Sequence, residues 1–307
     1  MATVNKRTGR LYANVINGVD AGGIMTAALQ EGYDNVMQSS PDGLTLPIVD
    51  REIQVCRGSI VSQDWVEFVN LLTGTVGTCA FSERNRDVAA ATGYTDHVIT
   101  NPVIHRAVLS FVKGQYATVA YNFECKAADE TKGFTDMHTA TDGQPAPDYV
   151  SAARGGYRVE TIKHDPSGGS EIQFYHVSAF QFSLILPLIR RCNDADVGYT
   201  LVEAETDGMI AAGSVTFEDN SETGTALLYQ QLLGQAHKNL ELQLTQGQGA
   251  ADKVVTIANV LFNDARPALG AGNPVNAVTA NFVLNNVAGT PLTLDGANKI
   301  ITIANAA

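Results

Sequence analysis

The sequence has little positive charge. Its 20 Lys and Arg residues are outnumbered by 32 Asp and Glu residues, which gives a formal net charge of −12 and a pI near 4.8. Affinity for nucleic-acid phosphates comes from dense clusters of Lys and Arg, and this balance does not supply them. The composition therefore argues against a groove that binds DNA or RNA.

Charge of either sign is also scarce. Charged residues make up 17% of the chain and apolar residues 45%, whereas a soluble domain usually has about 25% charged residues. An ordinary solvated surface would be short of charge at this composition. Because the cores of subunit interfaces are depleted in charge, the sequence predicts that partner subunits cover part of the surface.

Cysteine pairs and long apolar runs are missing as well. The chain has four cysteines without CxxC spacing, far below the density of a disulfide scaffold: Cys56, Cys79, Cys125 and Cys192. Free buried thiols in a reducing compartment are expected. The longest apolar window, Phe180 to Ile189, is half the roughly 20 residues of a membrane span, and no signal-peptide pattern follows Lys6 and Arg7. The sequence predicts a soluble protein without a cleaved signal or a membrane segment.

No catalytic motif is present: there is no GxSxG, Walker, HExxH or GxGxxG sequence. Gly247-Gln248-Gly249 lacks the third glycine of a dinucleotide turn and favours a hairpin turn. Asp194, Asp196 and Glu205 fit the count of a calcium loop, but Tyr199 stands where glycine is required. The sequence therefore predicts no enzyme, no catalytic residue, no cofactor and no metal site.

Histidine and tryptophan have simple structural explanations. The six histidines form no short-spaced pair of metal-ligand type, so satisfied or surface positions account for them. The single tryptophan, Trp65, lies on the apolar stripe of an expected helix and is interpreted as a core anchor.

The most frequent pattern in the sequence is the alternation of apolar and polar residues. Apolar and polar residues alternate over 117–125, 180–186 and 240–244, as half-buried strands require. Two stretches have helical spacing instead: 63–72, with Ser62 as N-cap and Gly74 as stop, and about 222–233, closed by Gly234. The sequence predicts a mainly β (α+β) protein.

Four sequence blocks recur in order, which indicates an internal repeat. Arg57-Gly58-Ser59-Ile60 aligns with Ala212-Gly213-Ser214-Val215 at an offset of 213 − 58 = 155, and the Leu-Leu-(Thr)-Gly sequence follows in each half. Val98-Ile99-Thr100 aligns with Val254-Val255-Thr256 at an offset of 156, and Val119–Phe123 aligns with Val278–Phe282 at 159. We expect two copies of one sandwich-plus-helix unit, over about 10–128 and 157–287.

The repeat suggests a domain division. The first β domain with an N-terminal arm spans 1–128, a linker or arm spans 129–156, and the second β domain spans 157–307 with a C-terminal hairpin at 291–303 turning at Asp295-Gly296. The linker has two prolines, five acidic residues and no apolar period, so it is expected to be mobile in an isolated subunit and to contact neighbours through Phe134, Met137, Tyr149 and Val150. Deleting 135–147 should then leave the domains folded.

The strand-to-helix block at 57–66, the strands 97–111 and 116–124, and their repetition around Gly213 and Phe282 resemble phage tail tube proteins. The resemblance implies a β-sandwich with one flanking helix, duplicated as in some long-tailed siphophages. It also implies a trimeric ring with pseudo-sixfold symmetry, and rings stacked by the arm 1–10, the loop 31–47 and the linker 127–156. The implied location is the virion, after synthesis in the host bacterial cytoplasm, with tape-measure, tail terminator and distal tail proteins as partners.

The acidic balance fits a conduit, since an acidic wall repels phosphate over about 8–10 Å and lets DNA pass during ejection without specific binding. A tail hub, distal tail or neck ring protein of the same fold is the first alternative. A carbohydrate-binding sandwich is the second, although 7% aromatic residues and one tryptophan argue against it. An enzyme ranks last because no catalytic constellation is present.

Overall fold

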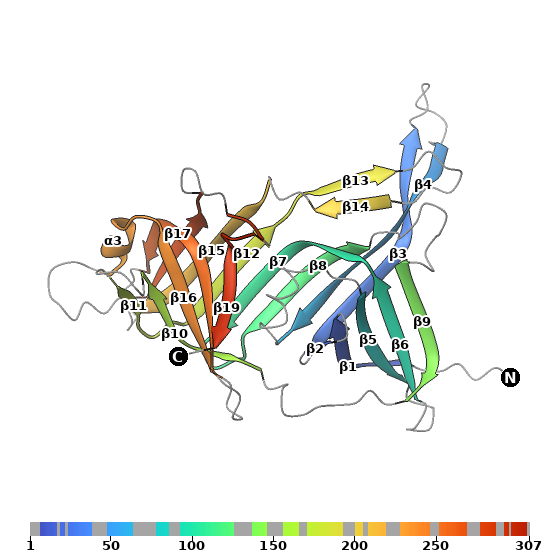
Figure 1. The fold of residues 1–307 in the computed structure, drawn as a ribbon, viewed down its shortest axis with the longest axis horizontal. Helices are drawn as coiled ribbons and strands as arrows, with labels where there is room; N and C mark the ends of the chain where they lie inside the picture. Colours follow the sequence, from blue (N-terminus) through green and yellow to red (C-terminus); the bar gives the residue numbers. More distant parts are fainter. Residues whose placement is uncertain are drawn as a thin grey trace.

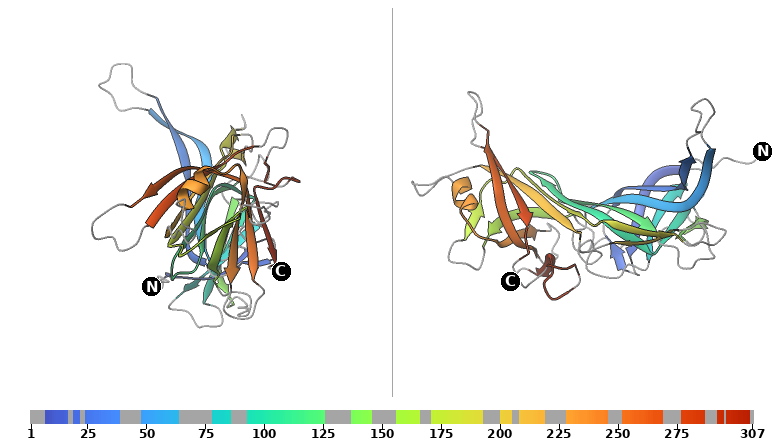
Figure 2. Two further views of the ribbon diagram at one scale, coloured as in Figure 1. Left: turned by 90° about the vertical axis from the view of Figure 1, so that its left-hand side faces the viewer. Right: turned by 90° about the horizontal axis from the view of Figure 1, so that it is seen from above.

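The computed structural model describes 16 segments of the chain: 7–16, 19–21, 24–38, 48–63, 78–85, 93–125, 137–145, 156–165, 171–192, 200–204, 208–218, 228–245, 252–268, 277–286, 292–294 and 296–305. Nearly all of them are antiparallel strands, so the expected mainly β class is confirmed. The long axis of the molecule runs between two groups of strands, one at each end (Figure 1, Figure 2).

The largest sheet crosses the whole molecule. Its strand order is β11-β10-β16-β17-β18-β15-β12-β7-β8-β4-β3, with β19 paired to β17. The bounds of these strands are β3 Ile24–Gln38, β4 Ile48–Ser62, β7 Pro102–Val112, β8 Thr118–Cys125, β10 Arg158–His164, β11 Ile172–Phe174, β12 Ala179–Ile185, β15 Ile210–Glu218, β16 Lys238–Thr245, β17 Lys253–Pro267, β18 Ala277–Leu284 and β19 Ile301–Asn305.

Two smaller sheets complete the fold. A five-stranded sheet has the order β2-β1-β5-β6-β9, from β1 Arg7–Ile16, β2 Val19–Ala21, β5 Thr78–Asn85, β6 Tyr94–Thr100 and β9 His138–Gln144. A hairpin of β13 Leu188–Cys192 and β14 Thr200–Ala204 extends from β12 and β15 toward β3 and β4 (Figure 1).

The core follows the alternation read from the sequence. In β12 the buried residues are Phe180, Phe182 and Leu184, and in β16 they are Leu240, Leu242 and Leu244. In β8, Val119, Tyr121, Phe123 and Cys125 are buried while the residues between them up to Asn122 are half exposed. All three predicted strands are confirmed, because period-two burial fixes both the strand and its face.

One predicted helix is confirmed in part. The structure describes α3 over Leu228–Leu233, with Leu232 buried and Gly234 donating its N–H to Gln230 and Gln231 carbonyls. Residues 222–227 lie outside the described segments, as does the expected helix at 64–72 with Trp65. The turn at 247–249 lies outside them too, but β16 and β17 on either side pair antiparallel, as the hairpin prediction requires.

Three expected irregular segments contain strands. The predicted linker 129–156 includes β9, which pairs with β6, and Met137 before it is fully buried in the chain's own core. The predicted loop 31–47 begins inside β3, and the predicted arm 1–10 ends inside β1. The expectation of no regular structure over 129–156 is wrong at 138–144, because β9 has the sequence HTATDGQ, whose polar strand face gives no hydrophobic alternation to detect. Phe134, Tyr149 and Val150 lie outside the described segments.

The C-terminal hairpin is also different from the prediction. Thr293 exchanges backbone hydrogen bonds with Asn298 and Ile300, so the chain does turn near Gly296. The strand that follows, β19, pairs with β17 instead of returning along the residues before the turn. Ile301 is thereby buried in the main core.

Candidate assembly edges

The middle of the large sheet is a junction between the two halves of the chain. Strand β7 pairs with β12 over Val112↔Ala179 to Arg106↔Ile185, without a register shift. Two bonds beyond the paired residues, Lys113 N–H to Ser178 O and Leu186 N–H to His105 O, extend the same register. Even-numbered residues of β12 therefore direct their N–H and C=O groups toward β7, and odd-numbered residues of β7 direct theirs toward β12.

Strand β3 ends the large sheet on one side. Among the described residues its paired strand is β4, with Leu29 opposite Gly58 and Glu31 opposite Cys56. The side chains of Thr26, Ala28 and Gln30 are exposed. Such an edge presents unpaired N–H and C=O groups to another strand.

The second half of β17 has an open edge as well. Within the described segments, residues 261–267 pair with β18 alone, whereas residues 253–257 lie between β16 and β19. Ala268 N–H donates to Ala277 O on β18, so the alternate residues Pro267 and Ala265 face the open side. Pro267 has no N–H, and Arg266 and Asp264 form an ion pair of 2.9 Å here, so this edge is partly blunted.

A glycine packs against a phenylalanine ring in each half. A Cβ at Gly58 would lie 2.6 Å from Phe123 Cζ and would meet the backbone oxygen of Ala28. A Cβ at Gly213 would meet Phe282 Cζ and the backbone oxygen of Gln181. Gly58 pairs with Phe123 and Gly213 with Phe282, so the two glycines have the same kind of neighbours in register.

An asparagine with positive φ marks the same bend in each half. Asn101 has φ 46° between β6 and β7, and Asn259 has φ 51° within β17. Three residues beyond each bend, the pairing shifts by one residue, between Ile104 and Arg106 and between Phe262 and Asp264. The two bends lie 259 − 101 = 158 residues apart, two residues more than the offset between Val98 and Val254 in the sequence alignment.

The outer face of the large sheet, which points away from the core, carries polar side chains and three exposed apolar ones, Val112, Ile185 and Ile210. By strand alternation it contains Gln30, Ser59, Asn122, Ser110, Gln181, Ser183, Ser214, Thr216, Thr279 and Asn281. Its charged residues include Arg57, Arg106, Arg266, Glu218 and Asp264, together with the pair Lys163 and Glu241 on β10 and β16. Glu124 lies on this side too but is only 2% exposed, so this part of the face is covered.

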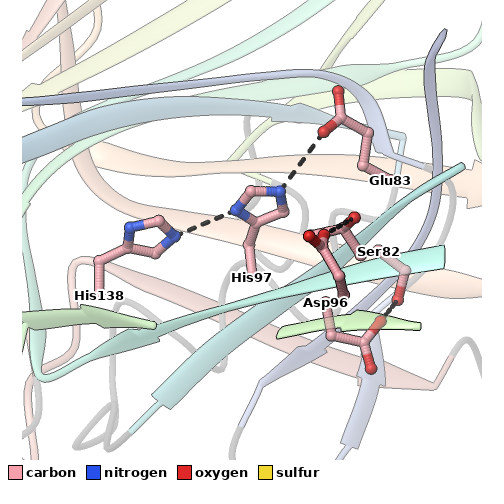
Figure 3. A network of polar contacts seen from close by, with 7 residues as sticks. Ser82, Glu83, Asp96, His97 and His138 are labelled. Carbon is pink, nitrogen blue, oxygen red and sulfur yellow. Dashed lines mark hydrogen bonds and ion pairs between the residues drawn. The ribbon is translucent and has the colours of Figure 1, made fainter. Parts of the chain in front are cut away.

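Four ionisable residues lie between the two sheets of the N-terminal half. His138 Nδ1 lies 2.8 Å from Glu31 Oε1. His138 Nε2 lies 3.1 Å from His97 Nδ1, and His97 Nε2 lies 3.5 Å from Glu83 Oε2 (Figure 3). The two imidazole rings are nearly parallel, with centroids 5.3 Å apart. We call Glu31, His138, His97 and Glu83 the histidine–carboxylate row. The row is not evident from the sequence, because the two histidines are 41 residues apart and come together only when β9 pairs with β6.

The remaining predictions about sites concern metal binding, cysteine thiols and membrane segments. In the part of the chain that the structure describes, no three His, Cys, Asp or Glu side chains are grouped so that they could hold a metal ion. Asp194, Asp196 and Glu205 lie outside it. Cys56 and Cys125 are buried free thiols with 3.4 Å between their sulfur atoms. None of the described helices is long and apolar enough to cross a membrane.

No protein-family model matches the chain, and no curated protein matches its sequence.

Proposed function

We propose that the chain is two tandem copies of one β-sandwich unit and that it assembles into rings that stack as a phage tail tube. The duplication is supported by strand pairing: β3-β4-β8-β7 in the first half has the order of β12-β15-β18-β17 in the second. Each set has its glycine opposite a phenylalanine, its asparagine bend and its register shift at corresponding positions.

The assembly proposal rests on the pairing of β7 with β12 at the junction between the halves. In the first copy, β7 is paired on its outer side by β12 of the second copy. The corresponding strand of the second copy is residues 260–267 of β17, and the strand corresponding to β12 is β3. No strand of the described segments pairs with the outer side of either one. Two complementary open edges on one chain predict head-to-tail contacts, which close into a ring when the rotation permits.

The internal junction also supplies a register. The residue numbers of corresponding positions differ by 153 between β3 and β12 and by 158 between β7 and β17. Leu184 lies opposite Ala107 at the internal junction, so Glu31 is predicted to lie opposite Ala265 of the next subunit. The pair Phe182↔Leu109 likewise predicts Leu29 opposite Pro267. Pro267 removes one bond from this ladder, which weakens pairing without blocking it.

In this proposal three chains form a ring of six sandwiches, and the outer face of the large sheet lines a channel. DNA would pass such a wall without specific binding, because the chain has a formal net charge of −12 and therefore no excess of positive charge. The arm, the long hairpin of β3 and β4 and the segment before β10 are the proposed contacts between rings. Tape-measure, terminator and distal tail proteins are the proposed partners in the virion.

A proline variant tests the edge contact. Ala27 corresponds to Phe180 in the proposed duplication, so its N–H is expected to point toward the open side of β3 and that of Ala28 toward β4. Ala27→Pro should therefore abolish rings and tubes in sedimentation and negative-stain images while the subunit stays folded. Ala28→Pro is the matched control, expected to lower stability by about 3 kcal/mol because it removes a bond within the subunit.

Three results would change the proposal. A wild-type protein that stays a monodisperse monomer at high concentration would contradict assembly altogether. Rings that survive Ala27→Pro would show that β3 is not the contact. Closed single rings at every concentration would favour a tail hub or neck ring protein over a tube.

A further inference from the structure

A cavity beside the junction of β7 and β12 is lined by both cations and apolar side chains. It has a volume of about 360 Å³ and lies between the turn after β7, the strand β10 and the residues that precede β12. Phe111, Ile162 and Phe174 form its apolar part, and these three side chains belong to the buried core. The core therefore opens here to a space in which an apolar side chain can be buried.

The open side of the cavity has an excess of positive charge. Lys113, Arg158 and His176 line it together with one carboxylate, that of Glu160, and all four residues are exposed. Among the described residues, no carboxylate forms an ion pair with Lys113 or Arg158. A local excess of cations is unexpected in a chain with a net charge of −12. The group that fits this cavity combines negative charge with an apolar side chain.

Arg158 is held in place by an aromatic ring. Its Cζ lies 5.1 Å from the centroid of the Tyr116 ring, in the turn between β7 and β8. The backbone beside this contact is fixed as well, since Ala117 N–H donates to Tyr157 O at 2.7 Å. A guanidinium that stacks on a ring loses less side-chain freedom when it binds an anion. This side of the cavity is therefore preorganised for a carboxylate.

The hairpin of β13 and β14 begins at the opposite end of β12. The cavity lies before the first residue of β12, whereas β13 begins three residues after its last (Figure 1). A strand of seven residues spans about 20 Å, so the cavity and the hairpin lie at the two ends of one strand. Residues 193–199 connect Cys192 of β13 to its partner Thr200 of β14. We call 193–199 the hairpin tip.

The composition of the hairpin tip matches that of the cavity. The tip has the sequence Asn-Asp-Ala-Asp-Val-Gly-Tyr, with carboxylates at Asp194 and Asp196, apolar groups at Val197 and Tyr199, and no Lys or Arg. Residues 39–47, which connect β3 and β4 in the first half, contain a single carboxylate. Charge complementarity therefore favours the hairpin tip as the occupant of the cavity.

We propose that the cavity is the docking site for the hairpin tip of a second copy of the chain in the next ring. The inference rests on the proposed function, because the two ends of β12 meet only when rings stack. The strands of a barrel are tilted by about 35–45° to its axis, so their ends lie at two rims. Rings stacked head to tail place the rim with the cavity against the rim with the hairpin.

In the docked arrangement, Lys113 and Arg158 pair with Asp194 and Asp196, and an apolar side chain of the tip covers the apolar part of the cavity. An ion pair between exposed residues changes affinity by only a few-fold. A ring of three chains makes three such contacts with the next ring, however, and their effects multiply. A twofold change at each contact becomes about eightfold for a pair of rings.

Charge reversal tests the contact from each side. The cavity variant carries Lys113→Glu and Arg158→Glu, and the tip variant carries Asp194→Lys and Asp196→Lys. Both should form rings like the wild-type chain, because these side chains take no part in the proposed contact of β3 with β17. Tube growth, measured by sedimentation and negative-stain images at a series of concentrations, should need at least about tenfold more protein. Growth of the cavity variant at the wild-type concentration would overturn the docking site.

A mixture of preformed rings makes the test independent of folding. Rings of the cavity variant accept the reversed tips of the tip variant, and their own acidic tips fit its unchanged cavities. The two kinds of ring should therefore alternate, and the mixture should grow into tubes within about threefold of the wild-type concentration. A mixture that keeps its rings but forms no tubes would contradict the inference.

A variant with Lys253→Glu and Lys299→Glu is the control for net charge. Both residues lie outside the lining of the cavity, and the two substitutions change the net charge as much as those of the cavity variant. This control should grow into tubes like the wild-type chain. An equal loss of growth would show that net charge controls stacking, against the inference. If the cavity variant forms no rings, Lys113→Gln replaces it, with growth expected to need at least about twofold more protein.

The outcomes separate this inference from the proposed function. Wild-type tubes together with unimpaired growth of the cavity variant would overturn the docking site and leave the proposed function intact. Absence of wild-type rings at every concentration would contradict both. Wild-type rings that never stack would favour a hub or neck ring protein and would also exclude the docking of one ring on the next.

Discussion

At the scale of single residues, Gly58 and Gly213 are fixed by the atoms around them. Gly58→Ala would bring a methyl group against the Phe123 ring and against a backbone oxygen that cannot turn away. We expect a loss of about 1–3 kcal/mol in the free energy of unfolding, measured by urea denaturation. Gly32→Ala is the control, because nothing lies within 4 Å of a Cβ at that position. Equal stability of the two variants would show that the Gly–Phe contact is not tight.

His164 gives a second prediction at this scale. Burial lowers the pKa of His164, although the nearby Val260 carbonyl and Asp165 oppose the shift. The unfolded chain then binds a proton at higher pH than the folded chain does, so this group lowers stability as the pH falls below about 6.5. His164→Leu should flatten the loss of stability between pH 7 and 5 measured by denaturation at each pH. An unchanged slope would mean that His164 is protonated in the folded protein.

At the scale of elements, β9 changes what a deletion should do. Residues 138–144 add a strand to β6, and Met137 is fully buried beside it. Deleting 135–147 therefore removes a strand and a core side chain, and exposes His97 to solvent. We expect loss of several kcal/mol of stability or failure to fold, measured by thermal denaturation of the purified subunit. A variant as stable as the wild-type chain would restore the linker interpretation.

The elements that could be predicted from the sequence are those with apolar alternation. Phe180, Phe182 and Leu184 gave the face of β12 directly, because each buried position repeats every second residue. β9 could not be found this way, since its residues contact solvent and the histidine–carboxylate row. The pairing of β7 with β12 could not be predicted either. Alternation predicts each strand, but which strand pairs with which depends on contacts between residues about 70 positions apart in the sequence.

Pro267 gives a prediction for the open edge of β17. It corresponds to Leu109, whose N–H faces β12 at the internal junction. Pro267→Leu should supply the missing donor and lower the concentration at which subunits assemble, by up to about tenfold for one added hydrogen bond. Sedimentation at a series of concentrations measures this. Ala268→Leu is the control, because the N–H at position 268 already donates to Ala277 O. This variant should assemble at the same concentration as the wild-type chain.

At the scale of the whole molecule, the proposed ring has a mass that can be measured. Each chain contains one internal junction, β7 with β12, and in the proposed ring it shares one equivalent junction with its neighbour. The pseudo-sixfold ring that the resemblance implies has six junctions and therefore needs three chains. Three chains of 32.6 kDa give 3 × 32.6 = 97.8 kDa, which native mass spectrometry can resolve from dimers and tetramers. A two-chain particle would require a self-complementary contact, in which the same edge meets its own copy. Here β3 and β17 are different edges with a defined register, so a stable dimer that does not grow with concentration would contradict the head-to-tail arrangement and with it the duplicated-ring interpretation.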